Sequence, residues 1–379
     1  MGIKIKQILK KLSAPLSFLN RIIPKDKHLV LIYSNLGFRD NAKALYDYMT
    51  ELGYNKKYKI VCSCCDFKFW KDKAPENVKF VGTKKGAWKF LRCSFMFYSF
   101  GKFPIKPGPK QKVVNLWHGM PLKTVGALEK GADFDGKCYF DYTIATSPFF
   151  SGIMQKCFNV GEDKVLRTGQ PKCDKLFIRD VREKKLILWL PTYRSSQKLG
   201  SVNVSLNNET GFPLINTEEQ LRDIDRLLSE LDYKLLIKPH PMQDLSHGVK
   251  GLENVMLTSQ RGLDRQGMDI YDLMKRSRAL ITDYSSVYFD YLLLDRPIGF
   301  TLGDIKQYEE ERGFVVKDPE SLMPGEKLKS FEDLRKFIIS AAKGEDSFRG
   351  ERKRVNELVN KDQSDGASRR LLDAVGISL

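Results

Sequence analysis

Short apolar runs alternate with helical stretches along most of this chain, and this alternation restricts the fold more than any other feature. Apolar runs such as His28 to Tyr33 and Ala279 to Ile281 predict buried strands. Strands that alternate with helices favour a parallel sheet covered by helices. The expected strands are 28–33, 58–63, 78–81, 93–99, 112–116, 142–146, 185–190, 233–237, 255–257, 279–281 and 297–300.

The stretches between these strands carry apolar residues at helical spacing, and several have recognisable starts. Ser147-Pro148 combines a cap residue with a first-turn proline. Thr217 and Gln220 have the spacing of a capping box. The expected helices are 41–52, one that opens at 147–148, 217–231, 271–275, one from 287 onward, 331–343 and 351–359.

The alternating pattern occurs twice, on either side of a charged stretch at 174–185, and a chain of 379 residues can hold two domains. The fold class expected is therefore α/β, with two doubly wound domains. The expected parts are a basic amphipathic segment, an N-terminal domain, a C-terminal domain and terminal helices that could pack back on the N-terminal domain. Their bounds are 1–27, 28–178, 179–345 and 346–379.

The first 27 residues form a basic amphipathic segment that Ser13-Ala14-Pro15 is expected to break or kink. Lysines lie between apolar residues, an arrangement that suits an interface with anionic lipid. The alternative is a helix packed on its own domain. The apolar positions that recur at three- and four-residue steps are Ile8, Leu9, Leu12, Leu16, Leu19 and Ile23.

The net charge of +17 would suit nucleic acid, an anionic membrane or a phosphate-rich substrate. No zinc-finger spacing, RNA motif or basic region with heptads is present, so no nucleic-acid partner is expected. No apolar run is long enough to span a bilayer, and no cleavable signal peptide is expected. The seven cysteines are expected to be reduced thiols, because their number and spacing suit neither a disulfide framework nor a zinc site.

Polar residues that could do chemistry follow four of the expected strands. The carboxyl ends of strands are where open α/β sheets bind ligands. Histidine exchanges protons near neutral pH, and cationic and hydroxyl side chains hold phosphates. Neither a G-x-G-x-x-G nor a P-loop motif is present, which disfavours nicotinamide enzymes and P-loop NTPases. The candidate site residues are His118, Gly119 and Lys123; Thr192 and Arg194; Lys238 and His240; and Asp283, Ser285 and Ser286.

Ser285 and Ser286 fall where a helix is expected to begin, directly after a strand and turn. Hydroxyl residues are favoured there as caps, and a helix N-terminus can also hold a phosphate. From this segment alone, an ordinary capped helix and a phosphate site are equally good interpretations.

Four of these segments, WHGMPLK, LPTYR, KPHP and TDYSS, resemble in order and spacing the CDP-glycerol glycerophosphotransferases. That family includes the polymerases and primases of wall teichoic acid synthesis and relatives that build phosphate-containing capsules. LGFRDNAKALYDYM and TGQPKCDKL resemble further segments of the family, so the resemblance runs from about Ser34 to Phe300. Met120 and Gln170 depart from the residues expected there, which leaves the subfamily and acceptor open.

The resemblance implies a GT-B-like fold of two Rossmann-type domains facing a central cleft. It implies transfer of glycerol phosphate, or a related alditol phosphate, from CDP-glycerol to a lipid-linked glycan or growing polymer at the cytoplasmic face of the membrane. His118 would be the catalytic base, and Arg194, His240, Ser285 and Ser286 would contact the diphosphate, with His240 also counted as catalytic. No cofactor is expected. The sequence has no carboxylate cluster for Mg²⁺, and a loosely held ion is left open.

Two other functions compete with this one. A glycosyltransferase of the same architecture would use a sugar nucleotide and release no CMP from CDP-glycerol. A non-catalytic basic protein would bind nucleic acid or acidic lipid with a steep dependence on salt. The histidines in strand-end turns argue against the second alternative, because a purely electrostatic binder does not need them.

Overall fold

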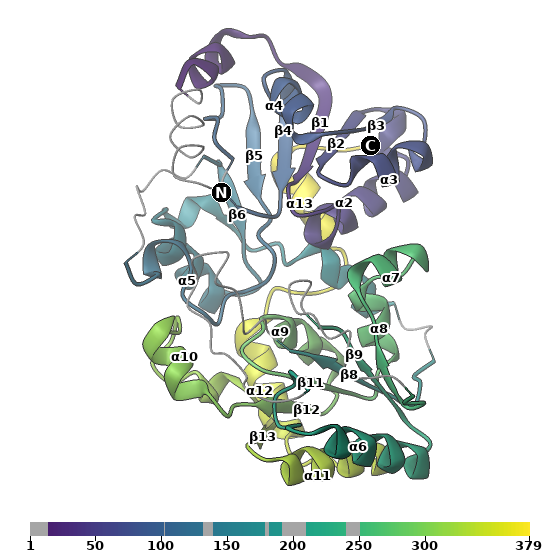
Figure 1. The fold of residues 1–379 in the computed structure, drawn as a ribbon. Coiled ribbons are helices and arrows are strands. Elements are labelled where there is room, and N and C mark those ends of the chain that lie inside the picture. The colour runs from purple at the N-terminus through teal and green to yellow at the C-terminus, as the bar shows by residue number, and fades with distance from the viewer. Residues whose placement is uncertain (1–13, 102, 132–138, 179–181, 192–209, 240–250) are drawn as a thin grey trace. The chain divides into compact units, whose positions relative to one another are not determined.

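The computed structural model describes residues 14–101, 103–131, 139–178, 182–191, 210–239 and 251–379. The chain forms two compact units, each built on one parallel sheet (Figure 1). Unit 1 comprises residues 1–120, 133–174 and 361–379, and unit 2 comprises residues 121–132 and 175–360.

The sheet of unit 1 has the order β3-β2-β1-β4-β5-β6-β7, and all its neighbouring strands are parallel. The order reverses between β1 and β4, which is the topological switch point where doubly wound sheets bind ligands. The strands are β1 (Asp26–Ser34), β2 (Lys59–Cys64), β3 (Val78–Val81), β4 (Cys93–Tyr98), β5 (Lys112–Asn115), β6 (Tyr142–Ile144) and β7 (Val165–Leu166).

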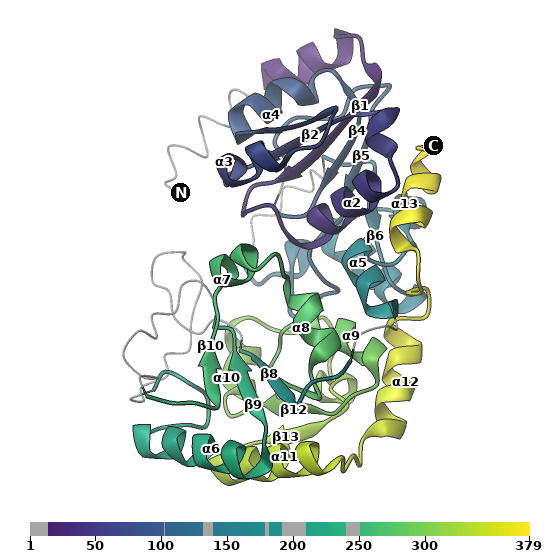
Figure 2. The ribbon, with the colours of Figure 1, turned by 90° about the vertical axis from the view of Figure 1, so that its right-hand side faces the viewer.

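Helices cover both faces of this sheet because its strands are apolar on both sides. On one face, Val30 and Ile32 pack in one core with Leu45 of α2 and with Leu371 and Leu372 of α13 (Figure 2). Ser147 caps α5 by accepting from the Phe150 N–H at 3.2 Å, which confirms the predicted helix start. The helices are α2 (Asp40–Glu51), α3 (Phe67–Trp70), α4 (Thr83–Phe90), α5 (Pro148–Phe158) and α13 (Ala367–Val375).

The sheet of unit 2 repeats the same topology, with the order β10-β9-β8-β11-β12-β13 and parallel pairing throughout. Its switch point lies between β8 and β11, where Thr282 pairs in register with Leu190. The strands are β8 (Leu186–Leu190), β9 (Lys234–Ile237), β10 (Val255–Leu257), β11 (Ala279–Thr282), β12 (Ile298–Thr301) and β13 (Glu326–Leu328).

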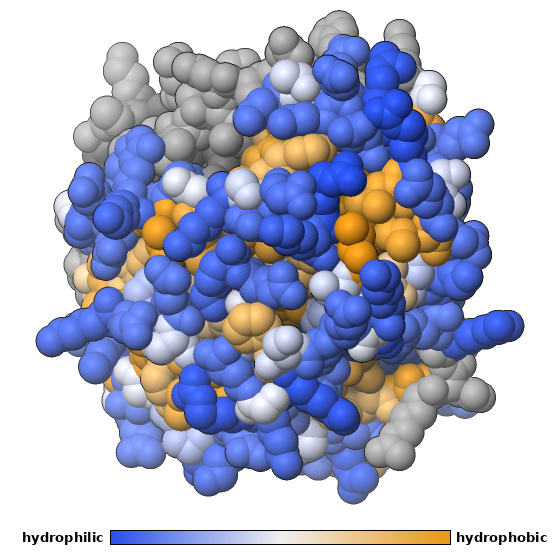
Figure 3. All heavy atoms as spheres, turned by 90° about the horizontal axis from the view of Figure 1, so that it is seen from below, coloured by the Kyte–Doolittle hydropathy of each residue, from blue (hydrophilic) through white to orange (hydrophobic). Residues whose placement is uncertain are grey.

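Two amphipathic helices, α6 and α11, bury their apolar sides in the core of unit 2, where Leu228 of α6 and Ile338 of α11 have no exposed surface. Figure 3 views the molecule from the side of these helices, and the residues there are mostly hydrophilic, with apolar ones in small separate areas. The helices are α6 (Glu218–Leu231), α7 (Gln260–Arg265), α8 (Ile270–Arg276), α9 (Val287–Tyr291), α10 (Ile305–Glu311), α11 (Phe331–Lys343) and α12 (Arg349–Val359).

The start of α6 differs in one detail from the predicted capping box. Thr217 accepts from the Gln220 N–H at 3.3 Å as expected. The Gln220 side chain accepts from the Asn216 N–H at 2.7 Å instead of from Thr217, so only half of the reciprocal pair forms.

Every strand expected from the sequence is present, with small shifts at its ends. The strands β7 and β13 were not expected. The first has only two residues, and the second carries Glu326 and Lys327, which hide it from a search for apolar runs.

Residues 14–22 are helical and precede β1. Its most exposed apolar residues are Phe18 and Ile22, at 66% and 63%, and Leu19 follows at 38%. The apolar stripe predicted from the sequence includes Leu19 but neither Phe18 nor Ile22. Three residues of that stripe, at positions 8, 9 and 12, lie outside the described residues. Within the described part of the chain, no helix is both long and apolar enough to cross a membrane.

Candidate active site

In unit 1, His118 lies in a turn that directly follows β5, at the carboxyl edge of the sheet. Asn115, the last residue of the strand, accepts from the Trp117 N–H through its Oδ1 at 3.0 Å and starts the turn. Trp117 has φ of +51° and Gly119 has φ of +140°, so His118 sits between two residues in unusual conformations. Such conformations are kept only where the surroundings enforce them.

The half-buried His118 ring has a defined orientation. Its Nδ1 lies 3.4 Å from the backbone oxygen of Ser99, just beyond the end of β4. The ring stacks on Phe100, with centroids 5.3 Å apart and planes 28° apart. Because a carbonyl oxygen only accepts hydrogen bonds, Nδ1 is assigned the proton. The lone pair is then on Nε2, which can take up a proton.

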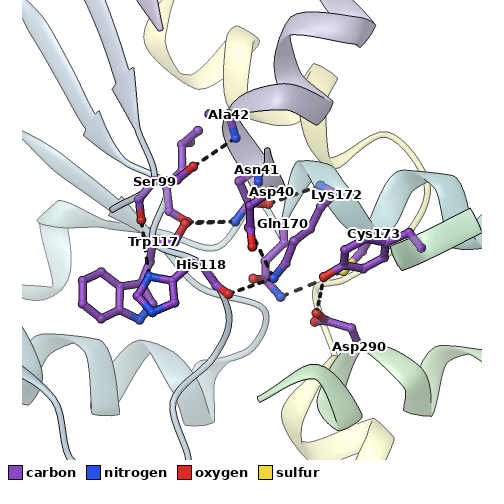
Figure 4. Close-up of polar contacts among 12 residues, drawn as sticks. Asp40, Asn41, Ala42, Ser99, Trp117, His118, Gln170, Lys172, Cys173 and Asp290 are labelled. Carbon is purple, nitrogen blue, oxygen red and sulfur yellow. Dashed lines mark hydrogen bonds and ion pairs between the residues drawn. The ribbon is translucent and has the colours of Figure 1, made fainter. Parts of the chain in front are cut away.

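A polar network of Asp40, Asn41 and Lys172 holds the turn in place (Figure 4). The Lys172 Nζ donates to the backbone oxygen of His118 at 3.0 Å and pairs with the Asp40 carboxylate at 3.4 Å. The Asn41 Nδ2 donates to the Leu116 oxygen at 3.0 Å, and its Oδ1 accepts from the Lys172 N–H at 3.2 Å. These residues come from α2 and from the segment after β7, so distant parts of unit 1 position the same turn.

Burial, three nearby charges and the hydrogen bond with the Ser99 backbone oxygen determine the pKa of His118. Burial lowers the pKa of His118, because it disfavours the charged imidazolium. The Asp40 carboxylate raises that pKa, whereas the Lys172 ammonium lowers it and Arg39 adds a smaller lowering effect. The net result is a lowered pKa, so the ring is neutral at neutral pH and suited to act as a base.

Asp40, Asn41, Lys172 and Arg39 were not among the residues predicted for the site. Arg39 lies over the ring of Phe100, with 5.6 Å between its Cζ and the ring centroid. Asp40 has φ of +60°, a further strained position. The sequence did contain a signal that could have identified these four residues. Each of them lies in LGFRDNAKALYDYM or TGQPKCDKL, the two further segments that resemble the family.

In unit 2, Asp283 follows β11 at the switch point of the sheet and is fully buried. The Thr282 hydroxyl donates to the Leu190 oxygen at 2.8 Å, which joins the ends of β11 and β8. On the other side of β8, the Lys238 N–H donates to the Trp189 oxygen at 3.0 Å. The predicted residues Lys238 and Asp283 therefore follow strands on either side of β8, at one edge of the sheet.

Ser285 and Ser286 follow Asp283, and the structure corrects the expectation that they cap the helix. Ser286 occupies the N-cap position of α9 but has helical backbone angles, with φ of −58° and ψ of −13°. Its side chain makes no capping hydrogen bond, because a capping residue normally has an extended backbone. Both side chains are half-buried, and neither hydroxyl has a hydrogen bond with the part of the chain that the structure describes.

Tyr284 anchors this turn from within and brings Lys123 beside it. The Tyr284 hydroxyl donates to the Asp304 carboxylate at 2.8 Å, and its ring lies 4.5 Å from that of Tyr308. The Lys123 Nζ lies 5.3 Å from the centroid of the Tyr308 ring, a cation–π distance, and Lys123 pairs with Phe314 in an antiparallel bridge. Lys123 thus belongs to unit 2, whereas His118 and Gly119 belong to unit 1.

The predicted residues therefore form two groups, each at the carboxyl edge of its own sheet. Unit 1 holds His118 and Gly119, and the neighbourhood of the switch point in unit 2 holds Lys123, Lys238, Asp283, Ser285 and Ser286. Thr192, Arg194 and His240 lie outside the described residues. Within those residues, no group of three or more histidine, cysteine or acidic side chains could hold a metal ion.

Comparisons with known proteins agree with these features. The profile of a family described as CDP-Glycerol:Poly(glycerophosphate) glycerophosphotransferase matches residues 16–376. The teichoic acid glycerol-phosphate transferase of Staphylococcus aureus (strain NCTC 8325 / PS 47) is 27% identical over 79% of this chain and 80% of its own length. The teichoic acid poly(glycerol phosphate) polymerase of Staphylococcus epidermidis (strain ATCC 35984) is 26% identical over 79% of this chain, which spans only 44% of that relative.

The fold is also that of a solved relative. The structure of the wall teichoic acid polymerase TagF has a TM-score of 0.74 with this chain, at 20% identity, and the match covers 97% of this chain and 92% of that one. Together with the two parallel sheets, this match assigns a GT-B-like fold and confirms the predicted fold class.

Proposed function

Since the chain belongs to the CDP-glycerol:poly(glycerophosphate) glycerophosphotransferase family, we infer that it is an enzyme that transfers glycerol phosphate from CDP-glycerol in teichoic acid synthesis and releases CMP. The observation that carries this function is the family match over residues 16–376. It covers both units and includes the two strand-end turns. If the chain were a non-catalytic basic protein, this match to an enzyme family would be unexplained.

We assign donor binding to the switch point of unit 2. Ser285 and Ser286 support this, because their hydroxyls are not used for capping and have no hydrogen-bond partner in the described part of the chain. Lys238 and Lys123 supply positive charge at the same edge, and cationic and hydroxyl groups suit a diphosphate. Arg194 and His240 keep the role of diphosphate contacts that the family resemblance implies.

The reaction follows from the chemistry of the donor. A hydroxyl oxygen of the acceptor attacks the β-phosphorus of CDP-glycerol and forms the new phosphodiester bond. The bond between that phosphorus and the bridging oxygen breaks, and CMP leaves with this oxygen. His118 accepts the hydroxyl proton on Nε2, and the donor-site cations stabilise charge on the phosphates. Phosphoryl transfer depends chiefly on such positioning and charge stabilisation.

We also propose that the chain associates peripherally with the cytoplasmic face of the membrane, where a lipid-linked glycan would serve as acceptor. The support is the helix at residues 14–22, which exposes Phe18, Leu19 and Ile22 beside the exposed Arg21. Apolar side chains that insert below the headgroups and basic ones that lie among them are typical of interfacial helices.

The proposed transfer is tested by supplying the purified chain with CDP-glycerol, CDP-ribitol or a UDP-sugar, each with a panel of lipid-linked acceptors. We expect release of CMP from CDP-glycerol and an acceptor that grows by the mass of glycerol phosphate. CDP-ribitol measures how strictly the donor is selected. Turnover of the UDP-sugar without CMP release from CDP-glycerol would instead establish the glycosyltransferase alternative.

If His118 is the base, the pH dependence of kcat/KM gives a test of its surroundings. The neutral ring is active and its pKa is lowered, so the acid limb should lie below pH 6.5, the ordinary value for histidine. Asp40→Asn removes a charge that raises this pKa and should move the limb to lower pH. Lys172→Gln removes a charge that lowers the pKa and should move the limb to higher pH.

These two variants distinguish an electrostatic role from a merely structural one. A loss of packing would lower kcat/KM in both variants without moving the limb in opposite directions. Shifts of the same sign, or no shift in either variant, would contradict the assignment of His118 as the titrating base.

A further inference from the structure

A large cavity of unit 1 lies at the amino edge of its sheet. It has a volume of about 990 Å³ and is lined by residues that precede or begin β1, β2, β4 and β5. His118 follows the opposite, carboxyl edge. Strands rise about 3.3 Å per residue, so the nine residues of β1 separate the two edges by roughly 26 Å. The cavity is therefore distinct from the candidate active site.

The lining of this cavity is strongly cationic. No acidic residue contributes to it, and none of its six cations forms an ion pair with a carboxylate of the described residues. Lys57 and Lys112 donate only to backbone oxygens, those of Ser378 and Val375. The cationic residues are Arg21, Lys25, Lys27, Lys57, Lys110 and Lys112.

Cations gathered without counter-charge favour an anionic ligand, because such a ligand relieves their mutual repulsion. Lys25 is held by the fold itself: its Nζ donates to the Leu91 oxygen at 2.6 Å and to the backbone oxygen and the side chain of Asn20 at 2.6 and 2.7 Å, so all three of its N–H groups are used. These bonds fix the chain that leads into β1. Burial lowers the pKa of Lys25, as expected for an ammonium partly withdrawn from water.

The same cavity also has an apolar side, which restricts the ligand further. Ile22, Ile23 and Pro24 line it, together with Phe95 of β4. Ile22 is 63% exposed. A soluble phosphate polymer would leave these apolar side chains in water, whereas a lipid would cover them.

We propose that this cavity binds the headgroup of an anionic glycerophospholipid, with the lysine and arginine side chains other than Lys25 on the phosphate and residues 22–24 against the attached chains. The inference rests on the proposed membrane association and deepens it. Diffuse attraction to a charged surface does not saturate when single lipid molecules are added. Binding of one lipid headgroup in a cavity does saturate. Phosphatidylglycerol is the simplest lipid with this chemistry.

The test uses monomeric dihexanoyl phosphatidylglycerol, titrated into the purified chain by calorimetry at constant ionic strength. We expect saturable binding. Lys27→Gln/Lys110→Gln should weaken it about tenfold, since each lost exposed ion pair contributes modestly and the two add. Lys71→Gln/Lys79→Gln is the matched control, because it removes the same charge from exposed positions of unit 1 outside the cavity and should leave the affinity unchanged.

Two further ligands identify the source of the phosphate. Dihexanoyl phosphatidylcholine should bind more weakly, and so should glycerol 3-phosphate. Equal binding of the choline lipid, or equal losses in the two double variants, would overturn the proposal. Glycerol 3-phosphate that binds as tightly as the lipid would assign the cavity to a soluble phosphate and would also overturn it.

The outcome is separable from that of the proposed function. The titration contains neither CDP-glycerol nor an acceptor, so a chain without transferase activity would still give it. Phe18→Ser/Leu19→Ser should reduce co-sedimentation with phosphatidylglycerol vesicles and spare the titration with monomeric lipid, because neither residue lines the cavity. A chain that sediments with vesicles but gives no saturable titration would keep the membrane association and reject the headgroup site.

Discussion

Replacing His118 with alanine is expected to lower CMP release from CDP-glycerol by at least about a hundredfold, the contribution of a positioned general base. The affinity for CDP-glycerol should stay close to that of the unaltered chain, because the donor is assigned to unit 2. The half-buried ring contributes its stacking on Phe100, so a modest fall in Tm is also expected. Single-turnover CMP release and equilibrium binding of CDP-glycerol separate these effects.

The chain offers a matched control for this variant. His28 is exposed at the start of β1, at the amino edge of the same sheet, and His28→Ala should transfer glycerol phosphate normally to a water-soluble acceptor. Near-normal turnover in the His118→Ala variant would reject His118 as the base. A parallel loss of donor affinity and turnover would indicate a binding role instead.

Replacing both Ser285 and Ser286 with alanine should have the opposite signature, a weaker affinity for CDP-glycerol with an intact fold. A hydrogen bond to a charged group contributes about 1.5–3 kcal/mol, so loss of two should raise the Kd by about a hundredfold or more. Stability should hardly change, because neither hydroxyl caps α9 or bonds to another described residue. Calorimetric titration of CDP-glycerol and thermal unfolding measure the two quantities.

Ser330 provides the contrasting control. Its hydroxyl accepts from the Asp333 N–H at 3.1 Å in a complete capping box at the start of α11. Ser330→Ala should therefore reduce the free energy of unfolding by about 1 kcal/mol and leave donor affinity unchanged. If Ser285→Ala/Ser286→Ala instead destabilised the chain and bound CDP-glycerol normally, the hydroxyls would have a structural role only.

The sequence predicts the sheets well because parallel strands buried on both faces appear as continuous apolar runs. Val78–Val81 and Val255–Leu257 were predicted to the residue, and both are short strands bounded by polar turns. The charged β13 could not be found in this way, since its position at the end of the sheet depends on pairing with β12 and not on its own residues.

The candidate site was predictable only in part, for a related reason. His118 could be placed after a strand because the apolar run stops just before it. Its partners could not, because Lys172 reaches its backbone oxygen from 54 positions away along the chain. Local spacing also misled the expectation for Ser286, since hydroxyl residues favour caps but its helical backbone angles exclude that role here.

The return of the last segment to unit 1 sets the order in which this protein can be assembled during synthesis. Leu371, Leu372, Val375 and Ile377 have no exposed surface and complete a core that begins with β1. All of unit 2 is translated before these residues leave the ribosome, and residues 175–360 of that unit are contiguous. Unit 1 must therefore wait, with part of its apolar surface uncovered, until nearly the whole chain exists.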